Sequence, residues 1–315
     1  MNTVHAVSAG RERTAPAAAT LPLVTDRAQG ARLNAPAVSV VVPTRDRPAA
    51  LERCLASLAR QTAPDLEIIV VDDGSGDPAA VRAVVARMAP GGRLIRGTGG
   101  GPAAARNIGV RGASGAVVCF TDDDCMPQPD WAQRLAAACG ATGAAAGTTH
   151  ADKAAGFAAA ASQLITHVLT VTSLSATNGG LGFAPSCNLA CATALARRLP
   201  FDASFPHAAG EDRDWCARLA QAGVALRFVP DAIVLHRPQV GLRALLRQQH
   251  RYGRAAVRFR TGDDGRQLAD VAFYRRLGRE AVRAGAGVAA LTVLAQAGIA
   301  AGVLQELALR LACRE

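Results

Sequence analysis

The sequence predicts an α/β fold in which a sheet of parallel strands carries helices on both faces and is followed by a helical tail. Short β-branched runs alternate with segments of helical periodicity over residues 37–240, which is typical of parallel strands joined by helices. Two of these runs end in clusters of aspartates, and such sheets bind ligands beyond the carboxyl ends of their strands. Residues 241–315 change to long helical stretches.

The composition supports a chain with a sizeable core. Of the 315 residues, 50% are hydrophobic and 19% charged, which excludes a disordered protein. No stretch before residue 284 approaches the roughly 20 apolar residues of a membrane span, which excludes a polytopic membrane protein. The eight cysteines lack metal-site spacing and mostly lie in apolar segments, so we expect buried, reduced thiols in a cytoplasmic protein.

The net charge of +10 has two interpretations. Lys153 is the only lysine, and such heavy use of arginine is what a GC-rich coding sequence produces. The alternative is a surface that binds anionic lipid, a nucleotide or nucleic acid. Because only 4% of the residues are aromatic, base stacking has few candidates and we expect no nucleic-acid partner.

The first elements follow from periodicity. Residues 1–36 are rich in Ala and Pro without periodicity, so we expect a disordered leader. A β-branched run over residues 38–42, closed by Pro43, predicts the first buried strand. Apolar residues at helical spacing predict a helix over residues 48–60, and residues 67–71 predict the second strand.

The next elements complete the alternation. Asp77 followed by Pro78 predicts the start of the second helix, because Asp caps helices and Pro suits their first turn. Short strands are expected at residues 93–96 and 116–121, with a helix over residues 103–112 between them.

Three successive acids follow the strand at residues 116–121. Asp122, Asp123 and Asp124 repel one another, so the loop gains no stability from crowding them. They either precede a helix over residues 128–139, where negative charge is favoured, or bind a divalent cation. At positions i and i+2, Asp122 and Asp124 would point to the same side of an extended backbone, which favours Mg²⁺ or Mn²⁺.

Two further acidic pairs have alternatives of their own. Asp72 and Asp73 either cap a turn in which Gly74 supplies a positive φ, or provide a carboxylate that accepts a hydrogen bond from a nucleobase imide. Glu211 and Asp212 precede an amphipathic segment. They either stabilise the N-terminus of a helix or supply a general base that acts on a hydroxyl.

Motifs of several other classes of protein are absent from the sequence. No Gly-x-Gly-x-x-Gly follows the first strand, and there is no P-loop, Gly-x-Ser-x-Gly elbow or His-Glu-x-x-His motif. A sugar-phosphate nucleotidyltransferase would need a glycine-rich loop after the first strand, which is also absent.

A set of motifs, in order, resembles family 2 glycosyltransferases with the GT-A fold. They are residues 38–47, 69–75, 101–109 and 120–127, and then 188–190, 201–202 and 210–212. The resemblance covers about residues 37–236. It implies transfer of a sugar from a nucleoside-diphosphate donor with inversion, a hexosyltransferase type of enzyme that depends on Mg²⁺ or Mn²⁺.

The resemblance also implies roles on the donor side. Asp73 would accept a hydrogen bond from the base, with Asp72 beside it. Pro43 and Thr44 would line the nucleotide pocket.

On the catalytic side, Asp124 with Asp122 would hold the metal on the diphosphate. Asp212 would deprotonate the acceptor hydroxyl for in-line attack at the anomeric carbon. Arg106 would contact the diphosphate, unless it is a solvated helix residue. His236 would be a further metal or phosphate ligand, unless it is structural.

Two departures from the family pattern bear on function. Asp46 stands where Asn is common, a change that we expect to be tolerated. The family's Gln-x-x-Arg-Trp processivity motif has only a partial counterpart at residues 248–252, which favours a single addition over polymerisation.

Two C-terminal segments suggest contact with a membrane. Residues 241–260 place five arginines on one helical stripe, which either faces solvent or lies at an anionic membrane surface. These are Arg243, Arg247, Arg251, Arg254 and Arg258. Residues 284–304 carry no charge and can just span a bilayer, although their many Ala and Gly residues also suit close helix packing.

The hypothesis has three parts. Residues 1–36 are the leader, residues 37–240 a GT-A glycosyltransferase domain, and residues 241–315 a tail that associates with the membrane. The enzyme would act at the inner, cytoplasmic face of the cell membrane on a lipid-linked or envelope glycan precursor. The alternative from another class is a non-catalytic sugar-nucleotide-binding or scaffold protein on the same fold.

Overall fold

A computed structural model shows how these segments pack together. It describes residues 37–140, 143–174, 180–205, 210–238, 241–260 and 271–312, without the side chains of residues 153 and 258–260. The expected leader at residues 1–36 lies outside the described residues.

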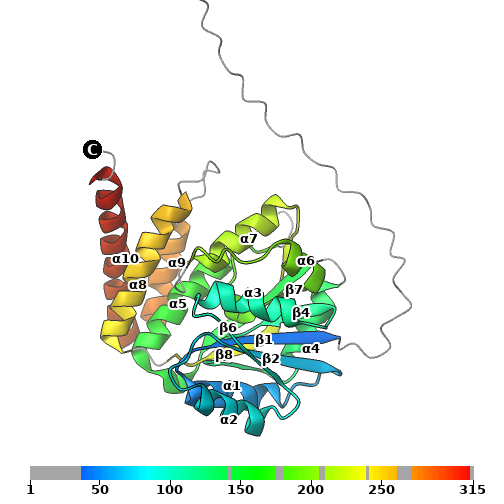
Figure 1. Ribbon diagram of the computed structural model, residues 1–315. Helices are drawn as coiled ribbons and strands as arrows, with labels where there is room; N and C mark the ends of the chain where they lie inside the picture. Colours follow the sequence, from blue (N-terminus) through cyan, green and yellow to red (C-terminus); the bar gives the residue numbers. More distant parts are fainter. Residues whose placement is uncertain are drawn as a thin grey trace, which may run out of the picture. The chain divides into compact units, whose positions relative to one another are not determined.

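A mixed sheet occupies the centre of the described chain (Figure 1). Its strands are β1 (Val38–Thr44), β2 (Leu66–Asp72), β3 (Arg93–Arg96), β4 (Val117–Phe120), β5 (Cys125–Pro127), β6 (Ala144–Ala151), β7 (Leu189–Ala192) and β8 (Leu226–His236). They lie in the order β3-β2-β1-β4-β7-β6-β8-β5. The part β3-β2-β1-β4 is parallel, as predicted.

The second half of the sheet corrects the expectation of parallel strands. Strand β7 runs antiparallel to both of its neighbours, β4 and β6, and β5 runs antiparallel to β8. An apolar run in the sequence predicts that a strand is buried, but it does not predict whether the strand runs parallel or antiparallel to its neighbours.

The predicted helices are present with shifts at their ends, and the described residues add three helices that were not predicted, over residues 156–172, 193–198 and 271–283. They are α1 (Pro48–Leu58), α2 (Pro78–Met88), α3 (Pro102–Gly112), α4 (Trp131–Cys139), α5 (Gly156–Thr172), α6 (Thr193–Arg198), α7 (Glu211–Gln221), α8 (Leu242–Arg260), α9 (Val271–Arg283) and α10 (Ala286–Ala312), with 3₁₀ turns η1 (Lys153–Ala155) and η2 (Ser186–Asn188). The first three begin at a proline, and Asp77 caps α2 by accepting from the backbone N–H groups of Ala79 and Ala80.

Helices cover both faces of the sheet, which confirms the predicted fold class. Alternation along β1 sends Val40 and Val42 into a core with α1, α2 and α4, and Val41 into a second core with α3, α6 and α7. Helix α3 lies very close to the sheet at Gly109, where a Cβ atom would be 2.3 Å from a methyl carbon of Val41.

The C-terminal helices pack against α5 (Figure 1). A third, smaller core joins them through Ile165, Val168, Leu245, Phe273, Leu277 and Ala295. The tail is therefore built onto the glycosyltransferase-like part through α5. The seven cysteines that the structure describes are buried and free, as predicted.

Asn188 is the polar centre of the second half of the sheet. It is fully buried, its Oδ1 accepts from Trp131 Nε1 at 2.8 Å, and its Nδ2 donates to the Ala232 carbonyl at 3.1 Å and to Thr149 Oγ1 at 3.3 Å. These bonds tie η2 to α4, β6 and β8. The family motif at residues 188–190 thus has a structural role at its first residue.

We expect the substitution Asn188→Ala to lower the free energy of unfolding by about 2–4 kcal/mol, because it leaves the buried Trp131 N–H and Ala232 carbonyl unpaired. Urea denaturation measures the change. The control is Gln133→Ala, an exposed amide on α4, which should cost less than about 0.5 kcal/mol. Equal losses for the two variants would contradict the role of Asn188.

Candidate active site

The predicted acidic clusters meet at one edge of the sheet. Thr44 ends β1, and its Oγ1 donates to Asp123 Oδ2 at 2.6 Å, while its carbonyl accepts from the Asp73 N–H at 2.8 Å. Because β1 lies between β2 and β4, Thr44 joins the two clusters. The edge holds several carboxylates that are nearly or fully buried, so each needs a partner.

Asp72 at the end of β2 has both of its carboxylate oxygens engaged, one by the turn that follows and one by β3. Oδ1 accepts from the Ser75 N–H at 2.9 Å, and Oδ2 pairs with Arg96. Burial raises the pKa of Asp72, but the bonds from Ser75 and the Arg96 charge outweigh it and hold the pKa below its ordinary value. Gly74 has the positive φ that this turn requires, 84°.

Asp73 differs, because one of its oxygens is buried without a partner. Oδ2 accepts from the Gly101 N–H at 2.8 Å, whereas Oδ1 has no hydrogen-bond partner among the described residues. Gly97 lies against it, where a Cβ atom would be 3.1 Å from Oδ1. An open acceptor of this kind suits an N–H group of a ligand.

Asp123 is the structural member of the triple-Asp run. Its side chain is fully buried and receives Thr44 Oγ1, and its Oδ1 lies 2.6 Å from a guanidinium nitrogen of Arg47. Burial raises the pKa of Asp123 to about 7, against the lowering effect of Arg47.

The structure brings Asp124 and His236 together. His236 ends β8, which pairs with β5 in a register that sets His236 opposite Cys125. Asp124 Oδ1 lies 3.3 Å from His236 Nε2, and Oδ2 accepts from Arg47 at 2.8 Å. Burial opposes charge on Asp124, but the hydrogen bond and charge of His236, then the Arg47 charge, bring its pKa below the ordinary value. Burial lowers the pKa of His236, yet the bond to Asp124 and its charge raise it to about 9.

Gln163 on α5 holds the other side of the His236 ring. Its Nε2 donates to the Thr149 carbonyl at 3.0 Å, so its Oε1 faces His236 Nδ1 at 2.9 Å and accepts from it. This leaves Nε2 of the ring directed at Asp124. Gln163 is buried, and the sequence analysis missed it because a single Gln in an Ala-rich helix carries no motif.

Asp122 does not join Asp124, contrary to the expectation of an extended backbone. Residues 123 and 124 form a turn, closed by the Cys125 N–H donating to the Asp122 carbonyl at 3.0 Å. Asp122 instead pairs with Arg106 at 2.7 Å. Asp122 thus turns toward Arg106, while Asp123 and Asp124 share Arg47 and Asp124 also contacts His236.

Arg106 is buried, which excludes the alternative of a solvated helix residue. It bridges Asp122 and Glu211, the latter at 3.1 Å, and lies over the ring of Phe201 with 5.6 Å to the centroid. Burial opposes charge on Arg106, but Asp122 and Glu211 raise its pKa above the ordinary value. Arg106 thus connects the end of β4 with the first turn of α7.

Asp212 lies in that first turn, with its Oδ1 accepting from the Arg213 N–H at 2.8 Å. Burial and the neighbouring Glu211 charge raise its pKa to about 7, above the lowering effect of Arg213 and Arg106. Burial and the negative charges of Asp212 and Glu211 also raise the pKa of the Tyr252 hydroxyl on α8.

The donor atoms at Asp124 fit a divalent cation in part. Ligand atoms of Asp124, Cys125 and His236 all lie within 4.8 Å of one another. Carboxylate and imidazole suit ions such as Mn²⁺. Burial and the adjacent Cys187 raise the pKa of the Cys125 thiol well above its usual range, so the thiol is protonated here. Two of the three predicted ligands therefore converge, and Asp122 lies with Arg106.

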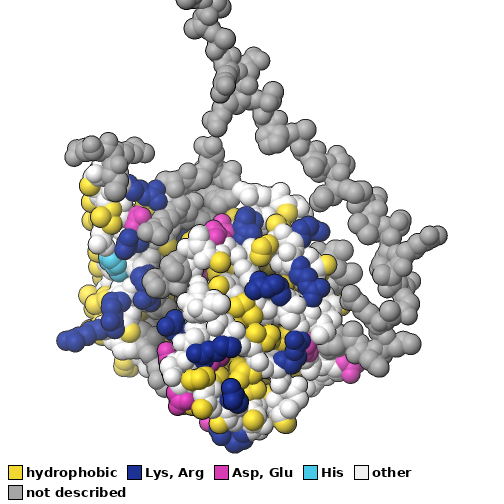
Figure 2. All heavy atoms as spheres, in the orientation of Figure 1, with side chains coloured by type: hydrophobic (Ala, Val, Ile, Leu, Met, Phe, Trp, Pro, Cys, Tyr) yellow, Lys and Arg dark blue, Asp and Glu magenta, His cyan; other side chains and the backbone are white. Residues whose placement is uncertain are grey.

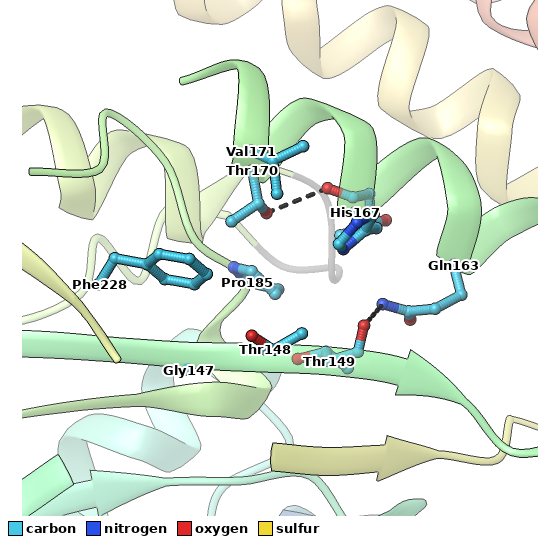
Figure 3. A pocket seen from close by; sticks show the side chains of 10 residues that line it. Gly147, Thr148, Thr149, Gln163, His167, Thr170, Val171, Pro185 and Phe228 are labelled. Carbon is cyan, nitrogen blue, oxygen red and sulfur yellow. Dashed lines mark hydrogen bonds between the residues drawn. The ribbon is translucent and has the colours of Figure 1, made fainter. Parts of the chain in front are cut away.

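A separate recess lies between α5 and β6 (Figure 3). It has about 260 Å³ of empty space, part of it open to solvent, and Figure 3 shows Gln163 bonded to Thr149 at its rim. Its lining residues are Gly147, Thr148, Thr149, Gln163, Thr166, His167, Thr170, Val171, Pro185 and Phe228. Gln163 is shared between this recess and His236.

Comparison with known proteins gives a consistent result. The sequence profile of glycosyl transferase family 2 matches residues 39–197. The glycosyltransferase AglE of Haloferax volcanii is 29% identical over 231 residues, covering 70% of this chain and 73% of that protein. The pre-mycofactocin glycosyltransferase of Mycobacterium tuberculosis is 31% identical over 226 residues, covering 70% of this chain but only 47% of that protein.

Solved structures share the fold. A mannosyltransferase from Pyrobaculum calidifontis in complex with GDP-Man and Mn²⁺ has a TM-score of 0.50 and 23% identity, covering 90% of this chain and 80% of that one. Residues 1–349 of S. aureus TarS in complex with UDP have a TM-score of 0.52 and 19% identity, covering 77% and 70%. The family profile covers about half of the chain, and the named relatives AglE and the pre-mycofactocin enzyme are glycosyltransferases. This chain therefore belongs to glycosyl transferase family 2 and is a glycosyltransferase with a nucleotide-sugar-binding fold.

Proposed function

We propose that the enzyme transfers one sugar from a nucleoside-diphosphate donor to an acceptor hydroxyl with inversion, assisted by Mg²⁺ or Mn²⁺. The observation that carries this proposal is the meeting of Asp124 with His236 at the sheet edge that also holds the open oxygen of Asp73. A nucleoside diphosphate needs a partner for its base and neutralisation for its phosphates, and this edge supplies both.

The donor would bind across the ends of β1 and β2. Asp73 Oδ1 would accept from the base imide, and the Gly101 N–H keeps the carboxylate in place through Oδ2. Pro43 and Thr44 would line the pocket as the last residues of β1. Asp72 would act by holding the turn, since both of its oxygens are engaged.

Asp124 and His236 would hold the metal ion beside the diphosphate. When bound, the ion would stabilise the negative charge that develops on the departing nucleoside diphosphate. Arg47 neutralises Asp124 in this structure while it also pairs with the buried Asp123, so it would share Asp124 with the ion. Arg106 would act by holding Asp122 and Glu211 in position.

Asp212 would be the general base. A pKa of about 7 lets an aspartate accept a proton from a hydroxyl far better than an ordinary carboxylate does. One base and one displacement at the anomeric carbon give inversion, and no second carboxylate need act as a nucleophile.

The acceptor would be a lipid-linked or envelope glycan precursor at the inner face of the cell membrane. Helix α10 supports contact with a membrane, because it is long and apolar, judged by length and composition alone. A single addition is proposed, since only a partial processivity motif lies at residues 248–252.

A screen of nucleoside-diphosphate sugars for nucleotide release tests the reaction. Asp212→Asn should lower kcat at least 100-fold because it removes the base, and Asp124→Ala should remove the dependence on added Mn²⁺. Asp214→Asn is the matched control, because this aspartate lies on α7 in an ion pair with Arg218. Wild-type metal-dependent turnover in both site variants would refute the assignment.

The pH profile gives a second test. Asp212 is active when deprotonated, so kcat/KM should rise with pH through about 7 and then level off. At pH 6 the value should be roughly tenfold below the plateau, since one pKa unit is a factor of ten in protonation. The residual activity of Asp212→Asn should lack this rise. A flat wild-type profile between pH 6 and 8 would contradict the base assignment.

A third test addresses Gln163 as a positioning residue for His236. Gln163→Leu removes the acceptor for Nδ1–H, so Mn²⁺ affinity of the donor-free enzyme should fall about 10- to 100-fold, measured by electron paramagnetic resonance. Gln163→Glu keeps an acceptor and should retain most of the affinity.

The background variant His236→Asn separates positioning from a general structural effect. In that background, Gln163→Leu should weaken Mn²⁺ binding no further, because the ring it orients is gone. A full additional loss there would show that Gln163 acts on the metal site through something other than His236.

A further inference from the structure

Helix α10 presents an apolar face that no described element covers. Six of its large hydrophobic side chains are between 44% and 69% exposed, namely Val293, Leu294, Leu304, Leu307, Leu309 and Leu311. Figure 2 shows hydrophobic side chains along the edge of the molecule where α10 lies. Soluble surfaces rarely leave so long an apolar stripe open, so this face indicates an interaction site.

The opposite face of α10 is locked against α8. A Cβ atom on Gly302 would be 2.0 Å from the His250 carbonyl oxygen, and one on Gly253 would be 2.0 Å from the Ile299 carbonyl oxygen. The two backbones are therefore in direct contact. Arg254 on α8 adds an ion pair of 2.9 Å to the buried Glu306 on α10.

The small residues of α10 that could join it to another helix in a bilayer are already packed against α8. Gly298 and Gly302 form a Gly-x-x-x-Gly pair, which commonly joins helices in bilayers, and here both lie against α8. A spanning α10 would have to carry α8 and its arginines into the hydrocarbon, or break from it and lose the ion pair between Arg254 and Glu306. The geometry favours a helix that stays on the protein.

Helices α8 and α9, which pack against α10, are strongly basic. Residues 241–260 and 271–312 contain eleven arginines and two glutamates. Both glutamates pair with arginine, Glu306 with Arg254 and Glu280 with Arg283. The exposed arginines on α8 and α9 include Arg243, Arg247, Arg251, Arg275, Arg276 and Arg279. A symmetric second copy bound to this face would bring the arginines of both copies close together, and repulsion between like charges disfavours that arrangement.

We propose that α10 lies flat on an anionic phospholipid bilayer, with its outer face in the headgroup region and the arginines of α8 and α9 on the lipid phosphates. An interfacial helix requires an apolar face together with basic side chains that can contact the lipid phosphates. At about 1.5 Å per residue, the helix gives a contact line of roughly 40 Å. The inference deepens the proposed membrane location and is independent of the transfer chemistry.

Co-sedimentation of the full chain with vesicles tests the proposal. Vesicles with 30% phosphatidylglycerol in phosphatidylcholine should bind the protein at least tenfold more tightly than phosphatidylcholine alone, and added salt should weaken the binding. The double variant Leu304→Glu, Leu311→Glu should lose at least tenfold, while Arg275→Ala, Arg279→Ala should lose the preference for the anionic lipid.

The matched control adds the same two charges elsewhere, as Ala83→Glu, Ala86→Glu on the exposed side of α2, and should bind vesicles like the wild type. Nucleotide release by each variant shows that the fold is intact and reports separately on the proposed reaction. Equal binding to both kinds of vesicle, resistance to carbonate extraction, or a solution dimer that the leucine variant dissociates would each overturn the proposal.

Discussion

The need to neutralise carboxylates at one edge of the sheet organises this glycosyltransferase. A buried charge is costly without a partner, and most of these acids pair with a cation from another element. Arg96 comes from β3, Arg47 from the start of α1, His236 from β8 and Arg106 from α3. These pairs connect the parallel half of the sheet with the mixed half, so the site and the fold share the same contacts.

The same balance separates structural acids from those open to ligands. Asp72 and Asp123 are fully engaged by neighbours, whereas Asp73 keeps one buried oxygen without a described partner. Asp124 is held by two cations that belong to side chains, and its partner His236 is oriented from behind by Gln163. A chain of buried polar contacts through Thr149 then reaches Asn188 and Trp131, so the site is braced deep into the core.

The C-terminal helices give the positive net charge a location. Their described residues hold eleven of the arginines against two glutamates, while the acids of the site lie at strand ends. Helix α10 has the length and composition of a membrane span, but its backbone is in close contact with that of α8, so the two helices form a packed pair. Burial and the charges of Asp212 and Glu211 raise the pKa of Tyr252 on α8, the helix that packs against α10.

The sequence by itself determined the local features. Periodicity revealed the strands and helices, Asp77 with Pro78 marked a helix start, and acids at strand ends marked the edge where ligands bind, because all of these depend on neighbours along the chain. Only the tertiary structure decided the direction of β7, the burial of Arg106, the place of Gln163 behind His236 and the register of α8 on α10. Each joins residues far apart in sequence, and a pairing over such distances is set by packing and charge neutralisation in three dimensions, which local patterns do not encode.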